Sequence, residues 1–408
     1  MKKKILILSK TPFASLSFHD RIDRLICYPA IGIPLFVLTV FLIFFLAFYG
    51  PGEYLAVLLE KLFIQTAEIF RTFLFRINTA EWLIRLLTDG IFLGVTSVIC
   101  FLPQTAILFF LLTVLTESGY MARAIFVMDT VMRSLGLSGK AISSFLIAFG
   151  CTVPAITKTK EMKADEKETV IRSLLFIPCS ARLPVLLFLV SECFETYPAL
   201  AAACFYILCF FTAFLSATLD SKKRKNEDTE PLILSLPDYK IPRLHILLRE
   251  TAEKSADFLI RACTIIFLCS AVLNLLGMLT PSFVLTEIPD ESILFHIGNL
   301  FSPIFQLLGF GNGAVAIALL SGFFAKESIV AALALLLPTG ITSVLSPAGA
   351  ISFCAFSMLY TPCMSSLHAI AKELGRKKAL RILLRTILFA FLISFALYTF
   401  TYVCTNCC

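Results

Sequence analysis

Charged residues are scarce in this chain of 408 residues, and the scarcity excludes several classes of protein. Asp, Glu, Lys and Arg make up 15% of the residues and hydrophobic residues 58%, whereas soluble proteins carry roughly 25% charged residues. A soluble globular protein is therefore excluded. The net charge of +7 does not indicate nucleic-acid binding, because no separate basic domain is present. Lysines and arginines collect in the cytoplasmic loops of membrane proteins, and this explains the charge better.

A phosphate-binding loop is also missing. The pattern G-x-x-x-x-G-K-[ST] does not occur in the sequence. The nearest segment, GLSGKA at 136–141, is too short and has Ala141 where a Mg²⁺-binding hydroxyl is required. No coherent hydrolase triad is visible either. We therefore expect that the chain is not an enzyme and does not hydrolyse a nucleotide by this route.

Long apolar runs dominate what is present. A membrane-spanning helix needs about 20 mostly apolar residues. Runs of that kind lie near Pro29–Gly50, Gly90–Glu117, Pro198–Leu219, Ala256–Leu279, Ala314–Pro338 and Ala379–Val403. The apolar stretch near the start is too short for a signal peptide, so we expect the first span to be retained. The sequence predicts an all-α, polytopic helical protein embedded in a lipid bilayer.

Charge divides the chain into four parts. We expect a polar cytoplasmic arm at 1–25, a first membrane half at 26–219, a cytoplasmic linker at 220–254 and a second membrane half at 255–408. The linker carries the run KKRKNEDTE and two prolines. Most of the 14 cysteines lie inside apolar runs, where a free cysteine behaves as a small buried hydrophobe, so no disulfide framework is expected.

The two halves resemble each other. Glu-Ser at 117–118 recurs at 327–328, Ala-Ile-Ser at 141–143 recurs at 350–352, and Pro154 recurs as Pro362, so the offsets fall from 210 to 208 residues. Internal repeats with the binding site at their interface are a common plan of transporters. We therefore predict two gate-type repeats with broken helices. Whether the repeats are parallel or inverted stays open.

Three breaks in the apolar runs each hold a cysteine close to a proline. They read FGCTVP, IPCSARLP and YTPC, and they contain Cys151, Cys179 and Cys363. In lipid an unsatisfied backbone group costs several kcal/mol, so broken helices persist only where they line a protein cavity. The three residues could simply be small side chains at kinks. We favour sulfur ligands that project into a pore, because thiols suit a soft or borderline metal cation.

Two carboxylates complete the candidate metal site. Glu117 and Glu327 occupy matching repeat positions at the ends of apolar runs, and an intramembrane carboxylate is a functional candidate by default. The alternative is an interfacial glutamate that faces water or caps a helix. Arg182 is expected to pair with Glu117 or with helix-terminal carbonyls, in a structural role. His368 is also expected to be structural, because it does not share a helical face with Cys363.

The motifs together resemble the membrane domain of the ferrous-iron transport protein B (FeoB) family. The segments that carry the resemblance follow the family's order over residues 20 to 400: DRIDRL at 20–25, GIPLF at 32–36, ESGYMARAIFVMD at 117–129, LGLSGK at 135–140, GCTVPA at 150–155, CSARLPV at 179–185, AKESIV at 325–330 and YTPC at 360–363. Thr152 stands where the family often has Asn, which puts an amide ligand there in doubt.

The resemblance implies Fe²⁺ as the transported substrate, pore-lining cysteines, no permanently bound cofactor and a location in the cell inner (cytoplasmic) membrane. Family members usually begin with a GTP-binding domain, so a split or truncated member is expected, with a separate G-domain protein as partner. Homo-oligomerisation stays open, and nucleic acid is not expected as a partner. Two other interpretations remain: a gate-domain permease for nucleosides or another small solute, and a membrane scaffold without transport.

Overall fold

The computed structural model is helical in all the elements it describes. The described residues are 23–194, 196–223, 239–240, 242–282, 284, 286, 291–324, 326, 328–337, 340–360 and 363–407. Two residues predicted from the sequence to matter, Glu327 and Pro362, lie outside this set, as do most of the N-terminal arm and part of the linker.

The first half begins with two long helices in succession, divided at Tyr49 and Gly50, and then passes through a π-helical turn into a third. These elements are α2 (Pro29–Phe48), α3 (Pro51–Arg76), α4 (Glu81–Arg85), η1 (Leu86–Phe92) and α5 (Leu93–Glu117). Shorter helices follow, with breaks between them: α6 (Tyr120–Ser134), α7 (Ala141–Gly150), α8 (Thr152–Lys158), η2 (Thr159–Glu161), α9 (Ala164–Leu174), α10 (Arg182–Cys193) and α11 (Pro198–Lys223).

The second half repeats this sequence of long and broken helices. Its elements are α12 (Leu244–Met278), α13 (Ile293–Gln306), α14 (Gly313–Phe324), α15 (Ser328–Leu336), η4 (Ile341–Ser343), α16 (Pro347–Leu359), α17 (Met364–Leu374) and α18 (Arg376–Cys407). The pair α7–α8, broken at Cys151, corresponds to the pair α16–α17, broken before Cys363. Helix order therefore agrees with the internal repeat seen in the sequence.

Membrane-crossing helices are confirmed by length and composition. Within the described residues, four segments are long and apolar enough to cross a membrane: Pro29–Arg76, Ile99–Glu117, Pro198–Ser221 and Arg376–Thr405. The bent pair α16–α17 would make a fifth. The chain is thus a multi-pass membrane protein.

One expected span is corrected by the structure. The run Ala314–Pro338 is not one helix, because α14 ends at Phe324 and α15 begins at Ser328. Lys326 lies between these helices with only 4% of its surface exposed. A buried ammonium needs partners that a straight apolar helix does not supply, and this is the physical reason for the break. The run Ala256–Leu279 is part of α12, which starts earlier and takes up residues 244–254 of the predicted linker.

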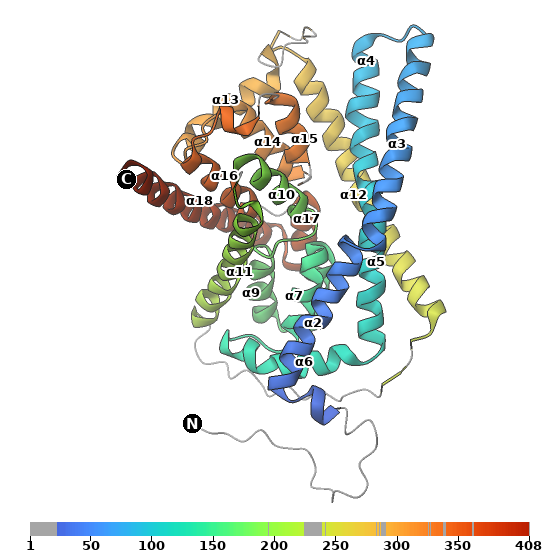
Figure 1. The fold of residues 1–408 in the computed structure, drawn as a ribbon, viewed down its shortest axis with the longest axis vertical. Coiled ribbons are helices and arrows are strands. Elements are labelled where there is room, and N and C mark those ends of the chain that lie inside the picture. The colour runs from blue at the N-terminus through green and yellow to red at the C-terminus, as the bar shows by residue number, and fades with distance from the viewer. Residues whose placement is uncertain are drawn as a thin grey trace, which may run out of the picture.

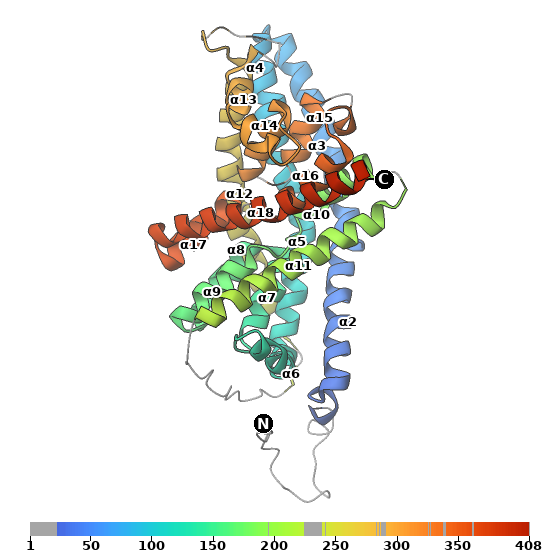
Figure 2. The same cartoon turned by 90° about the vertical axis from the view of Figure 1, so that its left-hand side faces the viewer.

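The two halves meet near the middle of the molecule. In Figures 1 and 2, α6, α7 and α9 of the first half lie below, whereas α13, α14 and α15 of the second half lie above. Between them α8 packs against α17, and α10 packs against α16. The long helices α5 and α12 pack along one side of this junction (Figure 1). The broken helices of the two halves therefore lie next to each other in the middle of the molecule.

Candidate functional site: a cavity at the helix breaks

A cavity of about 1270 Å³ opens at the junction of the two halves. Its wall includes the four predicted metal-site residues that the structure describes: Glu117, Cys151, Cys179 and Cys363. These residues come from four separate places in the chain. The structure therefore brings them onto one cavity, while Glu327, the fifth, lies outside the described residues.

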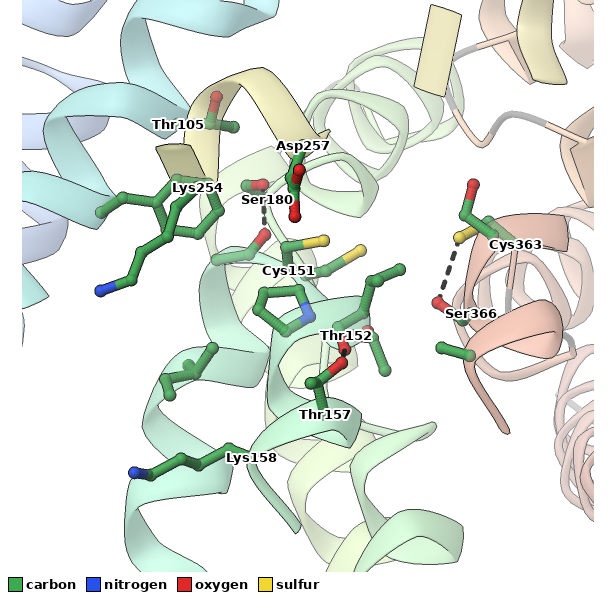
Figure 3. Close-up of a pocket in the computed structure, with 18 of the residues that line it drawn as sticks. Thr105, Cys151, Thr152, Thr157, Lys158, Ser180, Lys254, Asp257, Cys363 and Ser366 are labelled. Atoms are coloured by element: carbon green, nitrogen blue, oxygen red, sulfur yellow. Dashed lines mark hydrogen bonds between the residues drawn. The ribbon is translucent and has the colours of Figure 1, made fainter. Parts of the chain in front are cut away.

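Cys151 occupies the first break. Its backbone is extended, with φ −148° and ψ 130°, between the end of α7 and the start of α8. The preceding carbonyl, of Gly150, accepts hydrogen bonds from the backbone N–H of Ser180 at 3.3 Å and from its hydroxyl at 2.6 Å. This contact joins the first break to the second, as the bond at Ser180 in Figure 3 shows. The contact also supplies hydrogen-bond donors to a carbonyl at the end of α7, where the broken helix itself supplies none.

Gly150 allows this break to pack closely on α5. A Cβ atom at position 150 would lie 1.9 Å from the Cδ2 atom of Leu108, whose side chain is fully buried. A larger residue at 150 would therefore push either Leu108 or the break itself away. The absence of a side chain at 150 therefore lets the first break lie close to α5.

Cys179 lies in the second break, between α9 and α10. Its carbonyl accepts a hydrogen bond from the backbone N–H of Arg182 at 3.0 Å. The Arg182 guanidinium donates from Nη1 to the carbonyl of Leu175, just after the end of α9, at 3.0 Å, and the side chain is buried. The expectation that Arg182 binds helix-terminal carbonyls is thus confirmed by geometry. It fixes the turn that presents Cys179.

Cys363 stands at the start of α17, on a different side of the cavity from Cys151 (Figure 3). Its Sγ atom is 3.2 Å from the hydroxyl oxygen of Ser366, in the first turn of the helix. Ser366 is buried and also lines the cavity. The thiol is therefore held in one orientation, toward the same space that Cys151 and Cys179 reach.

Glu117 ends α5 and is exposed, so it lies at a mouth of the cavity rather than in its depth. The chain reverses immediately after it, through Gly119 with φ 80° and ψ 1°. Glycine adopts this left-handed conformation readily, because it has no Cβ atom to clash with the backbone. Gly119 therefore sets the direction in which the chain leaves Glu117.

α12 supplies residues that the sequence analysis missed. Glu250, Lys254, Asp257 and Thr264 all line the cavity and recur at helical spacing along one face. The Lys254 ammonium donates to the hydroxyl of Thr113 on α5 at 3.0 Å. Asp257 lines the same cavity as Ser180 and Cys151, and all three are labelled in Figure 3. The signal in the sequence was this polar stripe, which the division into linker and second half concealed.

His368 also lines the cavity, on α17. The expectation that His368 is structural and not a metal ligand stays a prediction, because a residue on the cavity wall can have either role. Within the described part of the chain, no group of three or more His, Cys, Asp or Glu side chains is close enough together to hold a metal ion. The thiols and carboxylates are thus distributed around the wall.

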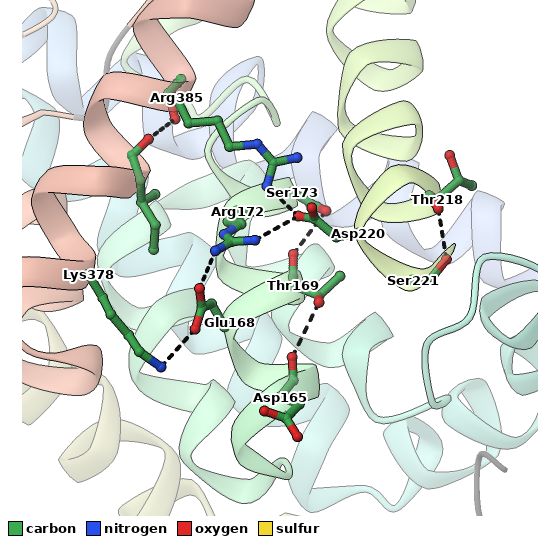
Figure 4. A network of polar contacts seen from close by, with 12 residues as sticks. Asp165, Glu168, Thr169, Arg172, Ser173, Thr218, Asp220, Ser221, Lys378 and Arg385 are labelled. Carbon is green, nitrogen blue, oxygen red and sulfur yellow. Dashed lines mark hydrogen bonds and ion pairs between the residues drawn. The ribbon is translucent and has the colours of Figure 1, made fainter. Parts of the chain in front are cut away.

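A network of ion pairs connects the first half to the second (Figure 4). Asp220, at the end of α11, pairs with Arg385 of α18 at 2.6 Å and with Arg172 of α9 at 3.4 Å. Arg172 also pairs with Glu168, which pairs with Lys378 of α18 at 2.8 Å. We call these five residues the interhelix clamp. It connects α9, which lies between the first two breaks, to α18, the second helix after the third break.

The charges of the clamp alter the acidity of Glu168. Partial burial by itself would raise the pKa of this carboxyl group. The hydrogen bond from Lys378 and the positive charges of Arg172, Lys378 and Arg381 outweigh that effect and hold the pKa below its ordinary value of 4.5. Glu168 therefore stays ionised, and the clamp stays intact, through the physiological pH range.

Paired helix breaks around one cavity, in a bundle of apolar helices, define the class of membrane proteins with gate repeats. The family Gate, described as "Nucleoside recognition", matches residues 98–192 and 259–377, which hold all three break cysteines. The family described as "Ferrous iron transport protein B C terminus" matches residues 202–254, between those two segments.

Relatives of known name agree with these matches. The chain is 36% identical over 366 residues to "Fe(2+) transporter FeoB" of Staphylococcus aureus (strain COL), an alignment that covers 87% of this chain and 55% of the relative. It is 33% identical over 390 residues to the protein of the same name from Methanocaldococcus jannaschii, covering 92% and 57%. The chain belongs to the FeoB family, and it spans about half the length of these relatives. No solved structure matches it.

Proposed function

We propose that this chain conducts Fe²⁺ across the cell inner (cytoplasmic) membrane, with Fe²⁺ as cargo and not as a resident cofactor. The observation that carries the proposal is the meeting of Cys151, Cys179 and Cys363, from three separate breaks, on one cavity. Fe²⁺ accepts thiolate and carboxylate ligands, and its selection depends on geometry and availability more than on affinity. The relatives' name, Fe(2+) transporter, agrees with this choice of cargo.

The arrangement of the ligands suits passage. Transport requires binding that is favourable enough to capture the ion and weak enough to release it. Cys151 and Cys363 stand on different sides of the cavity, so the three cysteines are proposed to act as successive stations, each offering one or two ligands while water completes the shell. Glu117 is proposed to attract the cation at the mouth, and Glu327 to serve the same purpose in the second repeat.

Opening is proposed to be driven by a separate GTP-binding partner. This chain lacks a phosphate-binding loop, and the interhelix clamp offers a mechanical connection between the breaks of the two halves. The polar arm at 1–25 and the linker at 220–254 are proposed as its docking surfaces. The four-part division of the chain is proposed with them, since the two Gate segments lie on either side of the linker.

A second candidate is a permease for nucleosides or another small solute. The volume of the cavity favours it, because sites for small organic ligands measure about 300–1,000 Å³ and this one holds about 1270 Å³. Its lining does not favour it: among the described residues on the wall there is no Asn or Gln to read a base. Uptake of a labelled nucleoside in proteoliposomes, in the absence of metal uptake, would support this alternative. Absence of both would leave a scaffold without transport.

The proposal is tested by exchanging sulfur for oxygen. Serine nearly matches cysteine in size but is a harder and much less acidic ligand, so Cys151→Ser, Cys179→Ser and Cys363→Ser should each fold and lose about tenfold in ⁵⁵Fe²⁺ uptake. Uptake is measured in proteoliposomes under reducing conditions and normalised to inserted protein. Cys204→Ser is the matched control, because Cys204 lies on α11 and away from the cavity. If all three variants transport like the control, the sulfur-lined pathway is wrong.

A further inference from the structure

Lys326 places a positive charge in the wall of the proposed cation pathway. Its side chain is 4% exposed, and it lines the same cavity as Cys179 and Cys363. A charge of this kind is costly to bury, and ionisable groups in membrane proteins generally face a pathway or a partner. An ammonium would oppose the passage of any cation that comes near it. Its position therefore requires a functional explanation.

The ammonium is held by an aromatic ring. Its Nζ atom lies 3.6 Å from the centroid of Tyr360, within the range of a cation–π interaction. The ring is itself fixed: Tyr360 is 5% exposed, its hydroxyl donates to the carbonyl of Leu319 at 2.8 Å, and it stacks on Phe356 with centroids 5.2 Å apart. The ring thus offers a rigid seat for a cation.

The contact joins two broken elements of the second half. Lys326 lies between α14 and α15, and Tyr360 directly follows α16, three residues before Cys363. A movement that separates these helix ends would take the ammonium off its seat. The charge is therefore placed where a rearrangement of the break would move it.

We propose that Lys326 is the electrostatic barrier of this pathway, seated on Tyr360 while the pathway is closed and withdrawn when it opens. The proposal rests on the proposed function, since it assumes a pathway for cations. In the closed state the fixed charge repels every cation, in proportion to the charge of the ion. Lys326 thereby sets how fast cations leak through the closed protein, and how strongly this leak rate depends on the charge of the ion.

The height of the barrier is proportional to the charge of the ion, and this gives a quantitative test. Removing a barrier that is twice as high for a divalent ion should raise its leak rate by the square of the factor found for a monovalent ion. If Lys326→Gln raises the leak of ⁸⁶Rb⁺ by about tenfold, the leak of ⁴⁵Ca²⁺ should rise by about a hundredfold. Lys326→Arg should leave both close to the wild-type values. Leaks are measured in proteoliposomes without a partner and normalised to inserted protein.

Two results would overturn the barrier. Equal increases for the two ions would mean that the substitution merely loosened the structure, and no increase for either would mean that the charge blocks nothing. Should Lys326→Gln fail to insert and fold, Tyr360→Leu takes its place. It removes the ring that holds the ammonium in the pathway, so both leaks should rise, again by the larger factor for ⁴⁵Ca²⁺, and unchanged leaks would overturn the barrier. The leak assay contains no iron, so a chain that leaks as expected but carries no ⁵⁵Fe²⁺ would refute the proposed function alone.

Discussion

Asp220 offers the sharpest test of how the two halves are held together. Its carboxylate is 3% exposed and pairs with Arg385 and Arg172, whose side chains are 24% and 27% exposed. Asp220→Asn keeps the size of the side chain but leaves two neighbouring guanidinium groups without their shared anion. The substitution therefore tests the charge and not the packing.

The expected cost follows from the burial of the group. Removing one partner of a buried ion pair costs about 3–5 kcal/mol, while exposed pairs contribute about 0–1 kcal/mol. The carboxylate of Asp220 is buried but its partners are partly in contact with solvent. We therefore expect a loss of about 2–3 kcal/mol in the free energy of unfolding, between the value for exposed pairs and the value for buried pairs.

The measurement is reversible unfolding by SDS in mixed micelles, at pH 7 and constant ionic strength. A double-mutant cycle with Arg385→Gln should return a coupling energy of about 1–2 kcal/mol. Lys158→Gln is the matched control, since its pair with Glu161 is exposed, and it should change stability by less than about 0.5 kcal/mol. The reasoning fails if Asp220→Asn is as stable as this control.

Three further outcomes are expected. The folded-state pKa of Glu168 lies below 4.5, so the ionised carboxylate contributes its full stabilisation above pH 4.5 and loses it as the pH falls through the folded-state pKa. Glu168→Gln should therefore reduce the dependence of the free energy of unfolding on pH below 4.5. An unchanged pH dependence would contradict the assignment. Gly150→Val should lower the free energy of unfolding by about 1–3 kcal/mol in the same SDS assay. In the double variant, Leu108→Ala should restore part of this loss, so the loss for the double variant should be smaller than the sum of the two single losses. The purified chain should not hydrolyse GTP above a detergent blank, and phosphate release well above the blank would refute the prediction from its missing phosphate loop.

The sequence was sufficient for much of the fold because the relevant signals are local. Apolar runs such as Pro29–Gly50 exceed the length of a membrane span whatever their neighbours are, and four expected spans are present among the described residues. The same criterion of length and hydropathy wrongly predicted one span at Ala314–Pro338, because the average hydropathy of the run does not reveal the break at Lys326. A single buried charge changes an average little but decides whether a helix can continue.

The candidate site was only partly accessible from the sequence. Prolines and glycines marked the breaks at Cys151, Cys179 and Cys363, since each limits the local backbone. Asp257 and Lys254 were missed, because the polar stripe to which they belong crosses the predicted boundary between the linker and the second half. Their place on the cavity depends on the packing of α12 against α5.

By itself the sequence determined that this is a multi-pass membrane protein of the FeoB family with three cysteines at helix breaks. Helix length, apolar composition and backbone restriction are properties of neighbouring residues, so they can be recognised without the fold. The tertiary structure decided that those breaks share one cavity, that Arg182 binds a helix-terminal carbonyl and that Lys326 rests on Tyr360. These contacts join residues from separate helices, and the geometry that brings them together arises only when the helices pack.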